Sequence, residues 1–133
     1  MSDDACLPVA SEGDIVTARQ RVRALAASLG FSATDQTLIA LAVSEIARNI
    51  VTYATQGEVT LAEVSAGGRR GVQVLARDEG PGIADIELAM RDGYSTTRSL
   101  GMGLPGARRV MDEFDIVSAP GGGTTIRMIK WLR

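Results

Sequence analysis

Two glycine-rich motifs and an acid–amide pair constrain the fold of this chain more than any other feature. The first motif, DEGPG, occupies residues 78–82, and the second, GMGLPG, occupies residues 101–106. Upstream of both, Glu45 and Asn49 are four residues apart, a spacing that places two side chains on one face of a helix. Glycines let backbone N–H groups approach phosphate oxygens closely, and the start of a following helix adds a favourable dipole. Together the three features predict a site for a nucleotide within one small domain.

Length and composition limit the chain to one domain and exclude several classes of protein. The 133 residues predict a single domain, 1–133, and the 45% apolar content is enough for a core. No apolar run is long enough to span a bilayer, and the acidic start lacks the pattern of a signal peptide. The single cysteine, Cys6, has no partner for an internal disulfide and is expected to be a small buried hydrophobe. We therefore expect a cytoplasmic protein without a membrane partner.

Charge and residue usage narrow the chemistry further. The net charge of −2 and the scarcity of aromatic residues argue against a nucleic-acid partner. The chain has no histidine, which excludes a Ser-His-Asp triad, a histidine metal site and autophosphorylation on histidine. An enzyme built from this chain must therefore use carboxylates, lysines, arginines, hydroxyls or a bound metal.

The order of the predicted elements favours an α+β two-layer sandwich over alternating βαβ units. Hydrophobic periodicity and turn residues predict these elements, in chain order: strand 6–9, helices 14–29 and 34–53, strands 58–64 and 72–76, helix 103–114, and strands 115–118 and 124–132. A glycine-rich stretch, 66–70, is expected to form a hairpin turn.

Local signals refine the ends of these elements. Pro8 limits the first strand to the edge of a sheet, because proline cannot donate to a neighbouring strand. Asp14 is the expected N-cap of the first helix, and Gly30 is placed to end it. Thr34 or Asp35 is expected to cap the second helix.

The segment between the two glycine-rich motifs has no strong periodicity. From residue 79 to about 100 it carries glycines, Pro81 and a Ser/Thr cluster, with at most one helical turn near 86–91. A loop of this length in a compact domain is uncommon unless it is functional. We interpret it as a lid over a ligand, at about residues 80–100.

Each motif alone has an ordinary structural explanation. A lone G-x-G-x-x-G is often only a glycine-rich helix start, and this one lacks the Rossmann and protein-kinase contexts. Asp78 can be a turn aspartate that caps Gly80 and Gly82. An isolated E-x-x-x-N is most often a solvated helix face, here with Arg48 as a partner for Glu45.

The combination is far more specific and resembles the four motif boxes of the GHKL ATPase/kinase superfamily. The matching residues are Glu45, Asn49, Asp78, Gly80, Gly82, Gly101, Gly103, Gly123 and Thr124. The resemblance covers nearly the whole chain. It implies the Bergerat fold, which is an α+β two-layer sandwich with a mixed sheet, helices on one face and a mobile ATP lid.

Within that superfamily the chain is similar to the anti-sigma-factor-type serine/threonine kinases that switch stressosomes. Short segments across the chain carry this similarity: GDIV at 13–16, ARQ at 18–20, SEIARNI at 44–50, DGYST at 92–96, GLPG at 103–106, MDEF at 111–114 and IKWLR at 129–133. The resemblance implies ATP and Mg²⁺ as cofactors.

The resemblance also implies roles for the polar residues of the motifs. Glu45 would be the base that activates the acceptor hydroxyl, and Asn49 would ligate the Mg²⁺ that bridges the phosphates. Asp78 would bind the adenine amine, and Thr124 would assist through the same water network.

The glycines and one arginine complete the implied site. Gly80 and Gly82 would let the chain turn under the base, whereas Gly101 and Gly103 would contact phosphates from the lid. Arg98 is one place away from the phosphate-contacting arginine of related kinases. It is a candidate for the terminal phosphate, and an exposed lid arginine without contacts is the alternative.

The leading hypothesis is an ATP-dependent protein serine/threonine kinase that phosphorylates STAS-domain antagonist and scaffold proteins of a stressosome. The resemblance implies that phosphorylation releases the kinase, which then activates a PP2C-type phosphatase or similar downstream regulator. The alternative is a nucleotide-dependent anti-sigma factor or binding adaptor with the same fold and ATP site. A detached histidine-kinase catalytic domain is a third reading, and it would need a phosphoacceptor histidine on another chain.

Overall fold

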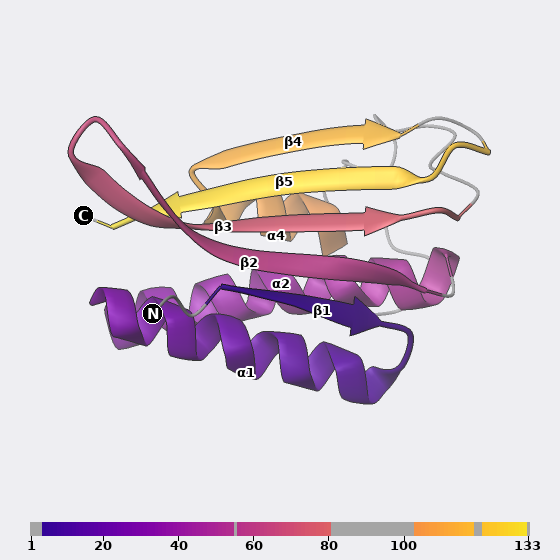
Figure 1. Ribbon diagram of the computed structural model, residues 1–133, viewed down its shortest axis with the longest axis horizontal. Helices are drawn as coiled ribbons and strands as arrows, with labels where there is room; N and C mark the ends of the chain where they lie inside the picture. Colours follow the sequence, from indigo (N-terminus) through magenta and orange to yellow (C-terminus); the bar gives the residue numbers. More distant parts are fainter. Residues whose placement is uncertain (1–3, 55, 81–102, 119–120, 133) are drawn as a thin grey trace.

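A computed structural model describes residues 4–54, 56–80, 103–118 and 121–132 as two packed layers (Figure 1). One layer is a five-stranded sheet, and helices cover one of its faces. The elements are β1 (Ala5–Val9), α1 (Glu12–Leu29), α2 (Ala33–Tyr53), β2 (Gly57–Ala66), β3 (Arg69–Asp78), α4 (Gly103–Val110), β4 (Glu113–Ser118) and β5 (Thr124–Trp131). The predicted α+β two-layer sandwich is confirmed.

The sheet has the strand order β1-β2-β3-β5-β4, and all four pairings are antiparallel. The mixed sheet implied by the resemblance is therefore wrong for the described strands. Two of the pairs, β2–β3 and β4–β5, are hairpins. The helices α1 and α2 connect β1 to β2, and β2 runs antiparallel to β1. β3 and β4 run in the same direction, but β5 lies between them. As predicted from Pro8, β1 is an edge strand.

Both long helices begin at a serine N-cap that was not predicted from the sequence. Ser11 is the N-cap of α1, and its hydroxyl accepts from the Asp14 N–H at 3.3 Å. Asp14 instead turns its carboxylate back to accept from the Ala10 N–H at 2.9 Å. Ser32 caps α2 in the same way and accepts from the Asp35 N–H at 3.1 Å. The predicted caps, at Asp14 and at Thr34 or Asp35, are wrong by two or three residues because serine is an equally good cap and lies earlier.

The turns follow the glycines as predicted. Gly30 ends α1 with φ 96° and donates its N–H to carbonyls of the last turn. Gly67 and Gly68, with φ 58° and 79°, form the two-residue turn between β2 and β3. Two successive positive φ values match the twist of the flanking strands, so this hairpin has a fixed register.

The predicted helix 103–114 is too long at its C-terminal end. α4 stops at Val110, and β4 begins at Glu113 instead of at residue 115. The Asp112 N–H donates to the Ile129 carbonyl at 2.9 Å, and Phe114 pairs with Met128 in the sheet. Pairing with β5 therefore overrides the helical periodicity of this segment. Cys6 also departs from expectation, because it is exposed on β1 rather than buried.

The hydrophobic core lies between the sheet and the helices. Alternate residues of the central strands face the helices and are buried: Val59, Leu61, Val72, Val74, Ala76, Ile126 and Met128. They pack against buried residues of α1, α2 and α4, which include Val22, Ile39, Ile46, Ile50 and Ala107. No helix among the described residues is long and apolar enough to span a membrane.

Ile46 tests how strongly this core fixes α2. Its side chain is 0% exposed, whereas Leu41 on the same helix is 41% exposed. We expect Ile46→Ala to lower the free energy of unfolding by about 2–5 kcal/mol, since it leaves a cavity that the packed core cannot fill. Leu41→Ala, of nearly equal size change, is expected to cost about 1 kcal/mol or less. Urea unfolding compares the two, and equal losses would contradict this account of the core.

Candidate functional site

Three elements that carry the sequence motifs meet at one end of the domain (Figure 1). The end of β3, the start of β5 and the C-terminal end of α2 all lie at this end, and α4 lies further in, packed on α2. On the helix-facing side of the sheet, the strand pairings place Gly57 next to Asp78, Asp78 next to Thr124, and Thr124 next to Ser118. Two predicted site residues, Asp78 and Thr124, are therefore neighbours on the paired strands β3 and β5.

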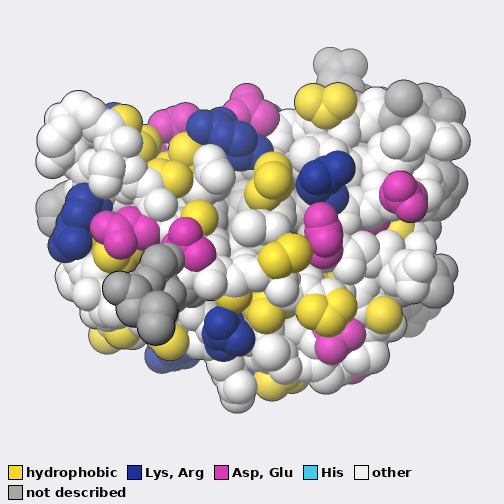
Figure 2. All heavy atoms as spheres, viewed as in Figure 1, with side chains coloured by type: hydrophobic (Ala, Val, Ile, Leu, Met, Phe, Trp, Pro, Cys, Tyr) yellow, Lys and Arg dark blue, Asp and Glu magenta, His cyan; other side chains and the backbone are white. Residues whose placement is uncertain are grey.

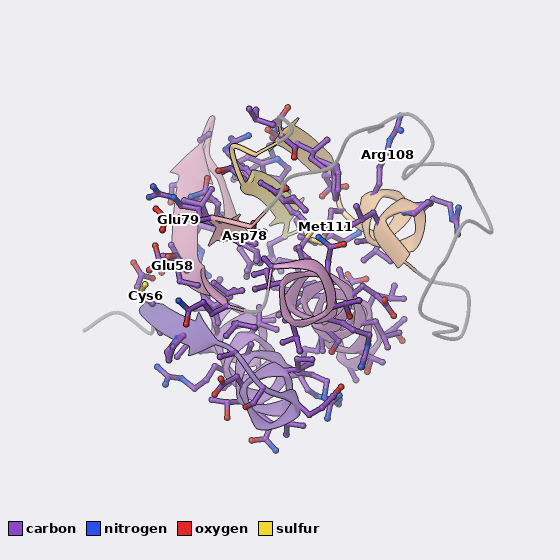
Figure 3. All side chains as sticks on the ribbon, turned by 90° about the vertical axis from the view of Figure 1, so that its right-hand side faces the viewer. Cys6, Glu58, Asp78, Glu79, Arg108 and Met111 are labelled. Carbon is purple, nitrogen blue, oxygen red and sulfur yellow. The ribbon has the colours of Figure 1, made fainter. Side chains whose placement is uncertain are left out.

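Asp78 is the last residue of β3 and is only half-buried. Its Oδ1 accepts from the Gly80 N–H at 2.9 Å, which fixes the orientation of the carboxylate. Gly57 stands beside it without a side chain, and a Cβ there would lie 3.0 Å from the Asp78 Cβ and 3.0 Å from Ile50 Cγ2. Figure 3 shows Asp78 at the end of the sheet that faces the viewer. The turn-aspartate explanation is thus correct for one carboxylate oxygen, and the second oxygen has no recorded partner among the described residues.

Thr124 opens β5 and is 5% exposed. Its Oγ1 lies 2.8 Å from the Oγ of Ser118, and the Ser118 hydroxyl also donates to the Gly123 carbonyl at 3.1 Å. Ser118 carries no motif signal and was not predicted. The hairpin pairing of β4 with β5 is what brings it to the site.

Glu45 and Asn49 lie one turn apart on α2, both half-buried. Their neighbours Ile46, Ala47 and Ile50 are buried against the sheet and α4, which fixes the rotation of the helix. Arg48 pairs with Glu12 of α1 at 3.3 Å, so its recorded ion pair goes to α1 rather than to Glu45. The pair therefore presents a carboxylate and an amide on one face, as the spacing predicted.

Gly80 lies where the chain leaving the sheet contacts the end of α2. A Cβ at this position would lie 2.5 Å from the Ala54 Cβ and 2.7 Å from the Ala54 Cα. The chain leaving β3 thus passes directly against the residue that ends α2, an approach that only glycine permits. Gly103 begins α4, which packs on α2 through Leu104 and Ala107.

The remaining predicted residues fall outside the part of the chain that the structure describes. These are Gly82, Arg98 and Gly101, together with the helical turn near 86–91 and nearly all of the lid predicted at about 80–100.

A polar groove of about 680 Å³ adjoins the site at the end of the sheet. Its lining includes Glu58, Arg77, Asp78, Glu79 and Thr125. In Figure 3 Glu58, Asp78 and Glu79 lie along one side of this end. Three carboxylates against one arginine make the rim of the groove acidic. Figure 2 shows the mixed charged and apolar surface of the face seen in Figure 1.

The described residues fit a divalent metal ion that is coordinated mainly by a bound nucleotide and only in part by the protein. Among the described residues, no three acidic, cysteine or histidine side chains group closely enough to hold a metal ion on their own. An amide oxygen such as that of Asn49 is a hard ligand, and Mg²⁺ is commonly bound by one or two protein oxygens plus substrate phosphates. One protein ligand from α2 is therefore consistent with a nucleotide-bound Mg²⁺.

Sequence comparison shows the family. Residues 8–130 match the family described as the histidine kinase-like ATPase domain. The chain belongs to this family, as the motif resemblance predicted, and the family uses ATP.

Among its relatives, the serine/threonine-protein kinase RsbT of Bacillus subtilis (strain 168) is 49% identical over 133 residues, which is 100% of both chains. A full-length match at this identity supports the same class of activity, that of a protein serine/threonine kinase. The anti-sigma F factor of Thermoanaerobacter sp. (strain X514) is 34% identical and covers 86% of this chain and 83% of its own length.

Two solved structures share the fold. One is the SiaB–SiaC complex from Pseudomonas aeruginosa, with a TM-score of 0.55 and 15% identity over 96% of this chain and 89% of that one. The other is the mycobacterial sensor histidine kinase MprB, with a TM-score of 0.56 and 17% identity over 96% and 97%. At these identities the likeness concerns the fold alone.

Gly123 provides a test of how tightly the site is built. Both Gly121 and Gly123 have positive φ, at 76° and 78°, but only at Gly123 would a Cβ collide with the backbone of Asp78 and Glu79. We expect Gly121→Ala to cost about 1–2 kcal/mol of stability from the left-handed backbone alone. Gly123→Ala is expected to cost more and to weaken ATP binding as well, because the Cβ pushes β5 away from β3. Urea unfolding and calorimetry measure both effects, and identical behaviour of the two variants would contradict the proposed close approach.

Proposed function

We propose that this chain is an ATP-dependent protein serine/threonine kinase of the partner-switching type. The single observation that carries the proposal is the meeting, at one end of the domain, of the Asp78–Thr124 pair with the helix that bears Glu45 and Asn49. The full-length similarity to a serine/threonine kinase supports the same reading.

The sheet side of the site is proposed to hold the adenine base. Asp78 can accept a hydrogen bond from the exocyclic amine, and Thr124 beside it can take part through a shared water. A carboxylate that accepts from a neutral donor forms a charge-assisted bond, which is stronger than a neutral one. Gly80 and Gly82 would let the chain pass beneath the base without a side chain in the way.

The helix side is proposed to carry the chemistry. Glu45 would take the proton from the acceptor hydroxyl, and Asn49 would ligate Mg²⁺. When bound, Mg²⁺ supplies charge neutralisation at the phosphates. Gly101, Gly103 and Arg98 are proposed to contact the phosphates. These assignments follow the motif resemblance, and the spacing of Glu45 and Asn49 on one face supports them.

The phosphoacceptors are proposed to be STAS-domain antagonist and scaffold proteins of a stressosome. A phosphate adds roughly −1.5 to −2 charges to the acceptor at pH 7. Near an acidic residue of the kinase such as Glu79, that charge would weaken the complex. The released kinase would then activate a PP2C-type phosphatase or similar regulator, in the cytoplasm.

A second candidate is a nucleotide-dependent anti-sigma factor or binding adaptor. The similarity to anti-sigma F factors, at 34% identity over 86% of this chain, favours it as the alternative. The two functions share the fold and the ATP site and differ in whether the bound partner is a substrate.

Asp78→Asn tests the base-binding assignment. We expect it to abolish measurable ATP binding, because the amide loses the charge and directs an N–H at the adenine amine. A hydrogen bond to a charged group contributes about 1.5–3 kcal/mol, or roughly 10- to 150-fold in affinity, before that repulsion is added. Asp115→Asn, on the opposite face of the sheet, is the control and should bind ATP normally. Calorimetry that finds unchanged affinity for Asp78→Asn would reject the assignment.

Transfer of label from γ-labelled ATP tests the kinase assignment. In the presence of Mg²⁺ and a STAS-domain acceptor, we expect the protein to label serine or threonine. Glu45→Ala should bind ATP normally but transfer phosphate roughly 100- to 10,000-fold more slowly, the range for loss of a general base. Glu63→Ala, at the far end of β2, is the matched control.

The outcomes separate the two candidate functions. ATP binding without transfer by the unmodified protein would favour the anti-sigma or adaptor function. Near-normal transfer by Glu45→Ala would refute the base role while leaving the kinase function in place.

A further inference from the structure

Two of the segments that carry the family similarity, MDEF at 111–114 and IKWLR at 129–133, have no part in the proposed nucleotide site. Their described residues lie side by side where α4 is followed by β4. The Asp112 N–H donates to the Ile129 carbonyl at 2.9 Å, and the Trp131 N–H donates to the Asp112 carboxylate at 2.7 Å. These two bonds attach the connection between α4 and β4 to the last strand of the sheet.

Lys130 is the strand residue that contacts the last turn of α4. Its strand partner Val72 is buried against the helices, so Lys130 lies on the same side of the sheet. The Lys130 Nζ donates to the carbonyl of Val110, the last residue of α4, at 2.9 Å. The last carbonyls of a helix have no partner within the helix and form the negative end of its dipole, so a cation is favourable there.

The other end of α4 is directed toward the candidate site. β4 begins close to Val110 and ends at Ser118, which pairs with Thr124 at the site. The C-terminal end of α4 therefore lies far from the site, and the end that begins at Gly103 lies nearer to it (Figure 1).

The short length of α4 makes its orientation sensitive to how its C-terminal end is held. Its lateral packing on α2, through Leu104 and Ala107, is apolar and therefore not directional. The helix has eight residues. At 1.5 Å per residue this is a rod of about 12 Å, so a tilt of about 10° at one end displaces the other by about 2 Å.

We propose that Lys130 is a positioning residue that directs the N-terminal end of α4 at the phosphates of the nucleotide. Lys130 holds one end of the helix, and the N–H groups of the first turn, which have no partners within the helix, lie at the other end. The base would instead contact β3 and β5, which pair through their backbones. Loss of the ammonium group should therefore weaken binding of the phosphates and leave binding of the base unchanged. This inference rests on the proposed function, in which Gly103 contacts the phosphates.

Lys130→Met tests the proposal, because methionine keeps an unbranched apolar stem and removes the ammonium group. We expect its affinity for ATP to fall about three- to tenfold, the effect of roughly one hydrogen bond to the phosphates. Its affinity for adenosine, which has no phosphate, should not change. Calorimetry measures ATP directly and adenosine by competition with ATP.

Arg70→Met is the matched control for a general loss of stability. The Arg70 guanidinium donates to the Leu29 carbonyl at 3.4 Å, at the C-terminal end of α1. The substitution thus removes a comparable cation from a helix that carries none of the proposed nucleotide-binding residues, and both affinities should stay unchanged. Lys130→Arg keeps the charge and the donors, and it should recover most of the ATP affinity.

Backbone amide chemical shifts follow the helix itself, without nucleotide. In Lys130→Met, the amides of Leu104 and Gly106 at the start of α4 should shift, whereas those of Asp78 and Thr124 should not. Arg70→Met should shift neither group.

A loss of equal size for ATP and adenosine in Lys130→Met would indicate a general structural effect and would overturn the positioning role. Unchanged ATP affinity in this variant, or unshifted amides at the start of α4, would also overturn it and leave the proposed function intact. Failure of the unmodified protein to bind ATP at all would reject the proposed function and this inference together.

Discussion

The pairing of β3 with β5 is the interaction on which the candidate site depends. Its register puts Asp78 opposite Thr124 on the buried face, and a shift of one residue would turn every side chain of β5 to the other face. The two strands can approach at this end because Gly123 has no side chain to collide with the Asp78 backbone. Gly57 gives the same freedom on the other side of Asp78. The glycines near the site therefore allow the strands to pack closely, in addition to any contact with a ligand.

The helix layer provides the second half of the site through a different constraint. α2 cannot rotate, because Ile46 and Ile50 are buried in the core, and Glu45 and Asn49 are consequently held at the half-buried border of the helix. Gly80 fixes the distance between the layers by packing directly on Ala54. A nucleotide bound as proposed would place its base against the rigid sheet and its phosphates toward the helix. Base recognition and chemistry would thus depend on different layers of the fold.

The features predicted correctly from sequence are those encoded locally. Glycine turns, the proline-limited edge strand and the spacing of Glu45 and Asn49 depend on residues close together in the chain. The incorrect predictions arise where two local signals compete, or where pairing with a strand distant in the sequence determines the structure. Ser32 and its downstream neighbours are all acceptable caps, and residues up to Phe114 have helical periodicity until pairing with β5 overrides it. Ser118 was missed because its position beside Thr124 depends on the register of the β4–β5 hairpin.

The separation of the two layers also bears on how one site can serve a kinase or a binding protein. The Asp78–Thr124 row is set by strand pairing and, at Thr124, is buried, so a protein partner does not need to touch it for ATP to bind. Glu45 is half-buried on a helix whose outer side also carries the exposed Leu41. If Glu45 is the base as proposed, an acceptor hydroxyl would approach from that side. Whether a docked partner is phosphorylated would then depend on how closely its hydroxyl reaches Glu45, since a misplacement of about 1 Å can cost roughly 100-fold in rate. A common nucleotide site and a variable docking geometry are sufficient, in physical terms, to give either outcome.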